Sequence, residues 1–183
     1  MKKNLSGKKI AVLMTDGFEE SEFTQPYQAL KDAGAEVEII SLQKGRIKSW
    51  KDKNWGSETE VDKTISEVSE SDYDALLLPG GVMNPDKLRM EKKVISFVTG
   101  FFDSHKPIAA ICHGPWTLVE TGKLGGRKLT SYPSIKTDLI NAGAEWVDKE
   151  VVVDNGLVTS RKPADLPAFC DKMIEEIAEG VHA

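Results

Sequence analysis

The sequence predicts an α/β protein, a three-layer sandwich in which helices cover both faces of a mainly parallel sheet. Short apolar runs at 9–14, 75–78 and 107–111 are typical of parallel strands that are buried on both faces. Segments with a helical spacing of apolar residues separate these runs. Such an alternation predicts a doubly wound sheet, whose ligands bind at the carboxyl ends of its strands.

The first predicted helix covers residues 20–33, directly after the strand at 9–14. Gly34 ends it, since glycine readily takes the left-handed backbone that commonly closes a helix. Pro26 lies inside this stretch, and proline lacks the amide hydrogen that a helix interior needs. The helix is therefore expected either to be kinked at Pro26 or to begin near Thr24 as its N-cap.

The remaining elements are predicted in the same way, strands from short apolar runs and helices from a helical spacing of apolar residues. We expect strands at 36–42, 75–78, 107–111, 151–153 and 157–159, and helices at 92–104, 115–121, 133–142 and 164–179. Asn155-Gly156 lies between two apolar runs, and Asn-Gly is a strong signal for a two-residue hairpin. The polar segment 43–62 is expected to form a β-hairpin or a loop excursion.

Composition places the chain among soluble globular proteins. Its 183 residues are 40% hydrophobic and 29% charged, which suits a single domain over 1–183 with a proper core. The net charge of −5 argues against binding to nucleic acid or to an anionic membrane, because both attract an excess of Lys and Arg.

The expected location is the cytoplasm. No apolar run approaches the roughly 20 residues needed to span a bilayer, and the polar segment Met1–Gly7 lacks the apolar core of a signal peptide. The chain has only two cysteines, Cys112 and Cys170, and such a low number is typical of free thiols in a reducing compartment.

Cys112 is the predicted nucleophile. It follows a buried strand, and Pro115 suits the first turn of the next helix. A sharp strand-turn-helix corner exposes a nucleophile, and the helix start is expected to stabilise the thiolate and lower its pKa. Cys170 lies on the apolar face of the last predicted helix and is expected in the core.

A cysteine nucleophile works with a base, and His113 is the only histidine expected near it. His105 precedes the strand that leads to Cys112, so it lies at the opposite end of that strand, and His182 lies near the end of the chain. His113 is adjacent to Cys112 in sequence, so the two side chains can pair only through the irregular backbone of a corner.

Acidic residues near the same strand ends could orient the base or bind the sulfur. The candidates are Glu19, Glu20, Glu22 and Asp86. Glu19 and Glu22 lie on one face of a starting helix, so one can point into the site, although acidic residues also simply favour a helix start. Gly80 and Gly81 would let backbone amides approach a developing oxyanion.

These groups would supply the chemistry without a cofactor. No spacing of Cys, His, Asp and Glu resembles a metal site, and the sequence contains no phosphate loop or dinucleotide fingerprint. The expected site therefore consists of a thiolate, an imidazole, a carboxylate and backbone amides.

Taken together, these residues resemble the PfpI-type intracellular cysteine proteases of the ThiJ/PfpI superfamily. The matching motifs are Asp16-Gly-Phe-Glu19-Glu-Ser-Glu22, Leu77-Leu-Pro-Gly80-Gly81, Ala110-Ile-Cys112-His113-Gly114-Pro115, Thr130-Ser-Tyr132, Asn141-Ala-Gly-Ala-Glu145, Glu150-Val-Val-Val-Asp154, Thr159-Ser-Arg161 and Pro163-Ala-Asp-Leu-Pro167. They run in order along nearly the whole chain. The resemblance implies a flavodoxin-like sandwich, an architecture shared with class I glutamine amidotransferases.

The resemblance also implies roles for individual residues. Cys112 would be the nucleophile and His113 the base. Glu22, with Glu19 close by, would hydrogen-bond the sulfur. The positions that match the oxyanion hole and the pocket are Gly81, His113 and Tyr132.

Asp86 matches the carboxylate that a neighbouring subunit supplies to the base in PfpI-type sites. The active protein would then be a homo-oligomer, a dimer or a hexamer. Asp86 is shorter than the Glu of some relatives. Two further departures are Trp116, where many relatives have Gln on the pocket floor, and the divergent segment 44–57.

Three functions are compatible with these residues. The first is a stress-related, cysteine-dependent hydrolase of small carbonyl or peptide substrates, which the adjacent His113 favours. The second is a glyoxalase or deglycase, in which Cys112 forms a hemithioacetal and Glu22 moves a proton. The third is a redox sensor or chaperone, since an accessible thiolate oxidises readily. An amidotransferase is discounted, because no internal histidine follows His113.

Overall fold

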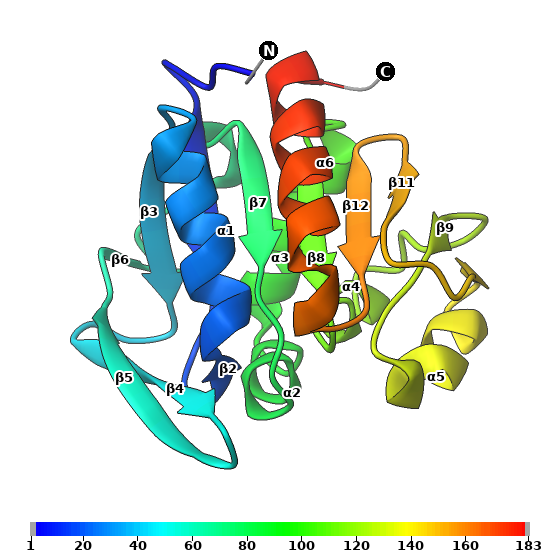
Figure 1. The fold of residues 1–183 in the computed structure, drawn as a ribbon, viewed down its shortest axis with the longest axis horizontal. Helices are drawn as coiled ribbons and strands as arrows, with labels where there is room; N and C mark the ends of the chain where they lie inside the picture. The colour runs from blue at the N-terminus through cyan, green and yellow to red at the C-terminus, as the bar shows by residue number, and fades with distance from the viewer. Residues whose placement is uncertain (1–2, 182–183) are drawn as a thin grey trace.

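The computed structural model describes residues 3–181 and shows an α/β sandwich with a seven-stranded central sheet (Figure 1). The strand order is β11 (Val152–Asp154), β12 (Leu157–Ser160), β8 (Ile108–Ile111), β7 (Ala75–Leu78), β1 (Lys9–Leu13), β3 (Glu36–Ser41) and β6 (Lys63–Thr64). Every neighbouring pair is parallel except β11 and β12, which form the predicted hairpin. The predicted fold class is confirmed. Residues 1, 2, 182 and 183 of the predicted domain, His182 among them, lie outside the described part.

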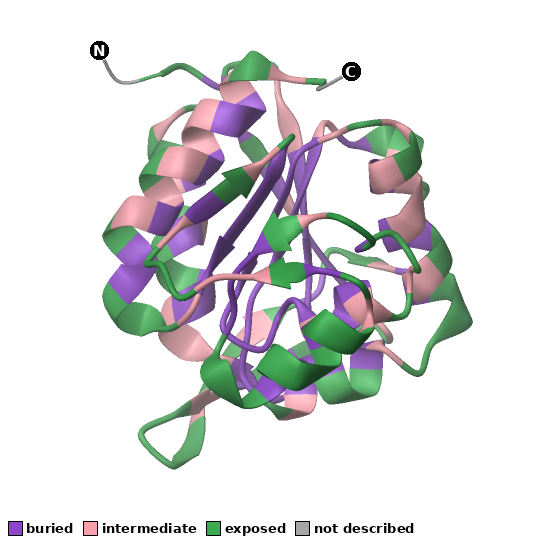
Figure 2. Cartoon of the chain, turned by 90° about the vertical axis from the view of Figure 1, so that its right-hand side faces the viewer, coloured by how far each residue is buried: buried purple, intermediate pink, exposed green. Residues whose placement is uncertain are grey.

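Helices cover both faces of this sheet. The first face carries α1 (Glu20–Asp32) and α6 (Leu166–Glu179), and the second carries α2 (Met83–Leu88), α3 (Lys92–Asp103), α4 (Trp116–Val119) and α5 (Lys136–Asn141). In β1, Ile10 and Val12 join the first core and Ala11 and Leu13 the second, because successive side chains of a strand point to opposite faces. The inner strands β1, β7, β8 and β12 are thus buried between two layers of helices (Figure 2). No helix within residues 3–181 is long and apolar enough to cross a membrane.

Helix α1 begins at Glu20 and continues through Pro26, rather than beginning near Thr24. Pro26 is buried against the core, so packing outweighs its lost hydrogen bond. The missing amide of Pro26 would otherwise bond the carbonyl of Glu22, one turn earlier. The helix ends as predicted before Gly34, whose φ is +93°.

The segment 43–62 forms a hairpin, the first of the two predicted alternatives. Strands β4 (Arg46–Lys51) and β5 (Asn54–Glu60) are antiparallel, and β4 also pairs with β2 (Phe18–Glu19). Trp50 and Trp55 face each other across the hairpin with ring centroids 5.5 Å apart. This second sheet extends from the body beside the lower end of α1 (Figure 1).

Several short elements differ from the predictions. The helix expected at 133–142 begins with a 3-10 turn, η2 (Pro133–Ile135), and the last helix likewise follows a 3-10 turn at Pro163–Asp165. Such turns are frequent at helix starts. Helix α2, the turn at Glu70–Asp72 and the strand pair β9 (Lys128–Leu129) with β10 (Glu145–Trp146) were not predicted. They are too short to show a period in the sequence.

Candidate active site

Cys112 stands at the corner between β8 and α4. Its φ of +63° lies in the left-handed region, which is uncommon for a residue with a side chain. Its amide donates to the carbonyl of Ser160 (3.0 Å), and its carbonyl accepts from the amide of Tyr132 (2.9 Å). These bonds hold the strained corner, so the sulfur lies where the strand-turn-helix pattern predicted it.

His113 lies beside Cys112, as the corner allows. Its Nδ1 is 3.2 Å from the Sγ of Cys112, and each of the two residues is only 8% exposed. On the other side of the ring, Nε2 is 3.0 Å from the Oγ of Ser134. Burial lowers the pKa of His113, so the imidazole is neutral near pH 7 and can accept a proton.

Glu22 is fully buried in the first turn of α1, near the sulfur. Neither carboxylate oxygen makes a hydrogen bond of ordinary geometry with the described residues. The Sγ of Cys112 and the amides of Gly80 and Gly81 still favour its ionised form. Burial and the charge of Glu19 outweigh them and raise the pKa of Glu22 to about 8. Near neutral pH Glu22 is therefore mostly protonated and can donate toward the sulfur.

The thiol of Cys112 does not have the lowered pKa expected from the helix start. Burial and the charge of Glu22 raise its pKa, against the backbone amides of His113 and Gly81. The expectation is wrong because α4 has only four residues, whereas the thiol is almost wholly removed from water. The two acids are coupled: while Glu22 keeps its proton, the charge that opposes the thiolate is absent.

Gly80 and Gly81 bring the turn after β7 against the thiol and the acid. A Cβ on Gly80 would overlap the carboxylate of Glu22 and lie 2.8 Å from the Cβ of Cys112. Gly81 has a φ of +82°, which glycine adopts without strain. Only glycine therefore allows this close approach of backbone amides to the sulfur.

Asn84 secures this turn, although sequence reasoning missed it. The side chain is fully buried at the start of α2. Its Oδ1 accepts from the amide of Thr15 (2.8 Å), and its Nδ2 donates to the carbonyls of Pro79 (3.0 Å) and Gly80 (3.1 Å). One amide thus ties the ends of β1 and β7 together.

Two aromatic side chains flank the imidazole. The ring of Tyr132 stacks on His113 with centroids 4.8 Å apart, and Trp116 meets it edge-on at 6.1 Å. The Nε1 of Trp116 donates to Asp138 (2.8 Å), and the guanidinium of Arg89 lies 4.9 Å from the Trp116 ring. Trp116 is thereby held in place beside the site, and Tyr132 stays 41% exposed at its rim.

Two predicted carboxylates lie further out. Glu19 is half-buried, and burial with the charges of Asp52 and Glu20 raises its pKa. Asp86 is exposed on α2, and its side chain makes no hydrogen bond or ion pair within residues 3–181. The structure therefore brings together the thiol, the imidazole and Glu22, and does not bring Asp86 to His113 of the same chain.

The other cysteine and histidine stand apart from this cluster. Cys170 is half-buried on α6 against the first core, and both cysteines are free thiols. His105 is exposed, three residues before β8 begins and so at the opposite end of that strand from Cys112.

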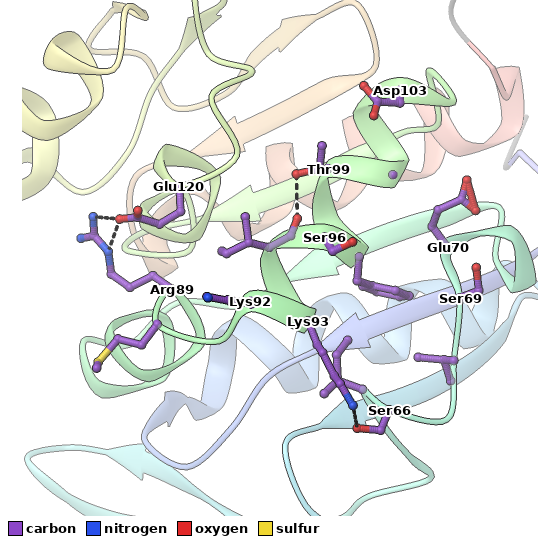
Figure 3. A pocket seen from close by; sticks show the side chains of 16 residues that line it. Ser66, Ser69, Glu70, Arg89, Lys92, Lys93, Ser96, Thr99, Asp103 and Glu120 are labelled. Atoms are coloured by element: carbon purple, nitrogen blue, oxygen red, sulfur yellow. Dashed lines mark hydrogen bonds and ion pairs between the residues drawn. The ribbon is translucent and has the colours of Figure 1, made fainter.

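A hollow of about 990 Å³ lies over α3 and includes none of the candidate site residues in its lining (Figure 3). Among the lining residues, Arg89 forms an ion pair with Glu120, and Lys93 donates a hydrogen bond to Ser66 (2.9 Å). The lining contains no cysteine or histidine, so this hollow lacks a nucleophile and a base. No group of His, Cys, Asp and Glu among the described residues could hold a metal ion.

Known proteins are similar to this chain over most of their length. A family model described as the DJ-1/PfpI family matches residues 8–176. General stress protein 18 of Bacillus subtilis is 51% identical over 164 residues, which are 89% of this chain and 94% of that protein. Protein/nucleic acid deglycase 2 of Escherichia coli is 51% identical over 163 residues, 88% of this chain and 93% of that protein. The crystal structure of Drosophila melanogaster DJ-1beta matches with a TM-score of 0.84 at 34% identity, over 93% of this chain and 90% of that one.

Proposed function

Since the chain belongs to the DJ-1/PfpI family, we propose that it is a cysteine-dependent deglycase, which removes early glycation adducts and contributes to a stress response. The observation that carries this proposal is the buried cluster of Cys112, His113 and Glu22, in which a base and a protonated acid flank one thiol. The names of the bacterial relatives support the substrate class and the link to stress.

Adduct chemistry needs both a base and an acid beside the sulfur. The Nδ1 of His113, 3.2 Å from Sγ, can take the thiol proton. Glu22, with its pKa raised to about 8, can give and take a proton near neutral pH. A peptidase needs only the base and an oxyanion hole. Peptide hydrolysis would therefore not explain why the carboxyl group of Glu22 is buried beside the sulfur, although such burial costs free energy.

The reaction balances without an oxidant or a reductant. For an adduct of methylglyoxal with an amine, the sulfur of Cys112 replaces the nitrogen at the carbinol carbon, and the amine leaves with the proton held by His113. Glu22 then carries a proton from the carbinol carbon to the neighbouring carbonyl carbon by way of an enediol, while the proton of the carbinol hydroxyl passes to the carbonyl oxygen, and this leaves a lactate thioester. Water hydrolyses the thioester and restores the thiol. Adduct and water thus give amine and lactate.

Peptide hydrolysis is the second candidate. The Cys112–His113 pair and the amides of His113 and Gly81 near the sulfur favour it, since such amides can bind an oxyanion. The low exposure of Cys112, 8%, favours small substrates over peptides.

We also propose that the active form is a homo-oligomer in which Asp86 of one subunit approaches His113 of another. Asp86 is exposed and has no partner among residues 3–181 of its own chain, and Val82 and Met90 on either side of α2 are 55% and 79% exposed. Apolar side chains exposed in this way favour a protein contact.

The decisive experiment compares the native protein with Cys112→Ala and, as a matched control, Cys170→Ala. Each protein receives N-acetyl-lysine treated with methylglyoxal, and the release of lactate and amine is measured beside cleavage of a fluorogenic peptide. We expect lactate from the native protein and from Cys170→Ala, and a loss of about a thousandfold or more in Cys112→Ala.

The other possible results of these two assays would change the proposal. Lactate release by Cys112→Ala at the native rate would exclude the proposed nucleophile. Peptide cleavage that depends on Cys112, without lactate, would support the second candidate. Neither activity in the native protein would favour a redox-sensing or chaperone role.

A further inference from the structure

The imidazole of His113 is buried, so both of its ring nitrogens need partners. Nδ1 faces the Sγ of Cys112 at 3.2 Å, and Nε2 faces the Oγ of Ser134 at 3.0 Å. Within residues 3–181 of one chain Ser134 is the partner of Nε2. In the proposed oligomer, Asp86 of a neighbouring subunit would approach the same edge of the ring, where a triad has its carboxylate. A buried ring nitrogen without a partner would be unfavourable, and the hydroxyl of Ser134 prevents it.

The two contacts have different consequences for the ring proton. A neutral imidazole has one donor and one acceptor nitrogen. Nδ1 can accept the thiol proton only if it is unprotonated, and the proton of the neutral ring must then lie on Nε2. The hydroxyl of Ser134 can accept that Nε2–H. Once Nδ1 is protonated, the same bond becomes charge-assisted and stronger.

The backbone ties Ser134 to the corner that holds the nucleophile. Ser134 is the middle residue of the 3-10 turn η2, which directly follows Tyr132. The amide of Tyr132 donates to the carbonyl of Cys112 (2.9 Å), and Ile135 anchors the turn in the second core. The backbone of Ser134 is thereby fixed beside the ring, and its exposed side chain reaches Nε2 through the hydroxyl.

We infer that Ser134 is a positioning residue. It holds the ring of His113 so that the unprotonated Nδ1 faces Cys112, and it stabilises the thiolate–imidazolium pair. The inference rests on the proposed function only in taking His113 as the base. Nothing in the sequence pattern assigns this role to residue 134.

The test measures the reactivity of the thiol itself and therefore needs no substrate. In a Cys170→Ala background, the rate of Cys112 alkylation by iodoacetamide is followed against pH for Ser134, Ser134→Thr and Ser134→Val. Threonine and valine have nearly the same shape, and only threonine keeps the hydroxyl. We expect Ser134→Val to react about tenfold more slowly at pH 7, with its pH midpoint about one pH unit higher. Ser134→Thr should stay within about twofold of the native rate.

Two controls separate positioning from structure. Thr137→Val removes an exposed hydroxyl from α5, in the turn that follows η2, and should leave the alkylation rate unchanged. Nitrogen-15 spectra of the native protein should show the neutral His113 ring protonated at Nε2. Equal rates for Ser134→Thr and Ser134→Val, or a ring proton on Nδ1, would overturn the inference. If Ser134→Val fails to fold, Ser134→Ala takes its place in the comparison.

This readout is distinct from the test of the proposed function. A native protein that releases no lactate, together with slow alkylation of Ser134→Val, would remove the deglycase proposal and keep the role of Ser134. Lactate release by the native protein, together with an unchanged alkylation rate of Ser134→Val, would keep the deglycase proposal and remove the role of Ser134.

Discussion

Cys112 keeps a left-handed backbone although its side chain disfavours it. With φ at +63°, its Cβ approaches the following carbonyl, which costs roughly 1–2 kcal/mol. The hydrogen bonds to Ser160 and Tyr132 hold the residue in this conformation. The position of the sulfur is therefore obtained at the expense of stability.

The first prediction follows from this strain. Cys112→Gly should be more stable to urea than Cys112→Ala by about 1 kcal/mol, because glycine takes positive φ freely. In the helical position 170 the order should reverse, with Cys170→Gly less stable than Cys170→Ala by a similar amount. Urea unfolding followed by tryptophan fluorescence measures both pairs, and equal stability of the first pair would show that the corner is not strained.

The second prediction concerns the pH dependence of stability. Glu22 keeps its proton in the fold up to about pH 8, whereas an ordinary glutamate loses it near 4.5. The folded protein therefore binds more protons than the unfolded chain between these values, and its stability falls as pH rises, by up to about 5 kcal/mol. Glu22→Gln cannot ionise, so its free energy of unfolding should decline less from pH 5 to pH 8.

Urea titrations at several pH values measure this difference directly. Glu60→Gln, on the exposed strand β5, serves as the control and should follow the native curve. Parallel curves for Glu22→Gln and the native protein would mean that Glu22 ionises normally in the fold.

The candidate site could be predicted from the sequence where its signals are local. Cys112 and His113 follow a buried strand and precede a helix start. For the acid, the local pattern allows both Glu19 and Glu22, and only the family resemblance selects Glu22. Ser134 and Asn84 could not be predicted, because they act on partners 21 and 69 positions away in the chain. The raised pKa of the thiol was missed for a similar reason, since burial depends on the whole fold.

Among the elements, the second sheet is fastened to α1 by one carboxylate. Glu20 accepts hydrogen bonds from the hydroxyl of Ser49 (2.6 Å) and from the amide (3.0 Å) and hydroxyl (2.9 Å) of Ser57. The ammonium of Lys51 lies 3.2 Å away. These groups lower the pKa of Glu20 to about 2. The hairpin is thereby attached to the turn of α1 that also carries Glu22.

The third prediction tests this attachment. Glu20→Ala should reduce the free energy of unfolding by about 1–3 kcal/mol, because it removes charge-assisted hydrogen bonds. Hydrogen exchange at the amide of Ser57 should become faster. Glu58→Ala, which removes only an exposed ion pair with Arg46, should cost less than about 1 kcal/mol. Unchanged exchange at Ser57 in Glu20→Ala would mean that other contacts hold the hairpin.

The elements themselves were predictable where apolar residues repeat. The runs of β1, β7 and β8 and the apolar faces of α3 and α6 specify buried strands and packed helices. Helix α2 escaped prediction because it has only six residues and contains Pro85. Pro26 is compatible with two predicted starts of α1, and the packing of its buried ring decides between them.

At the scale of the whole molecule, the proposed oligomer divides the site between subunits. Cys112→Ala and Asp86→Ala should each be inactive alone for different reasons, since the first lacks the nucleophile and the second the carboxylate offered to its neighbour. If the two chains are unfolded together and refolded as a mixture of dimers, half of the dimers are mixed and each has one complete site.

The fourth prediction is therefore that the mixture recovers about a quarter of the native activity. Lactate release and gel filtration measure the result. A mixture of Cys112→Ala with His113→Ala is the control and should recover no activity. Cys112 and His113 of each site come from the same subunit, so no mixed dimer contains a complete site. No recovery with Asp86→Ala in a confirmed mixed oligomer would leave Asp86 without a role in the neighbouring site.

Gly80 takes part in no bond-making step, yet it lies where a methyl group would strike both the carboxylate of Glu22 and the carbon that carries the thiol. In a library of random variants selected for activity, position 80 would therefore be as intolerant of change as position 112. Its intolerance would reflect the space that the neighbouring groups need. A map of tolerated substitutions alone would thus count Gly80 among the reactive groups. The distances between atoms show instead that residue 80 must lack a side chain so that Glu22 and Cys112 can lie close together.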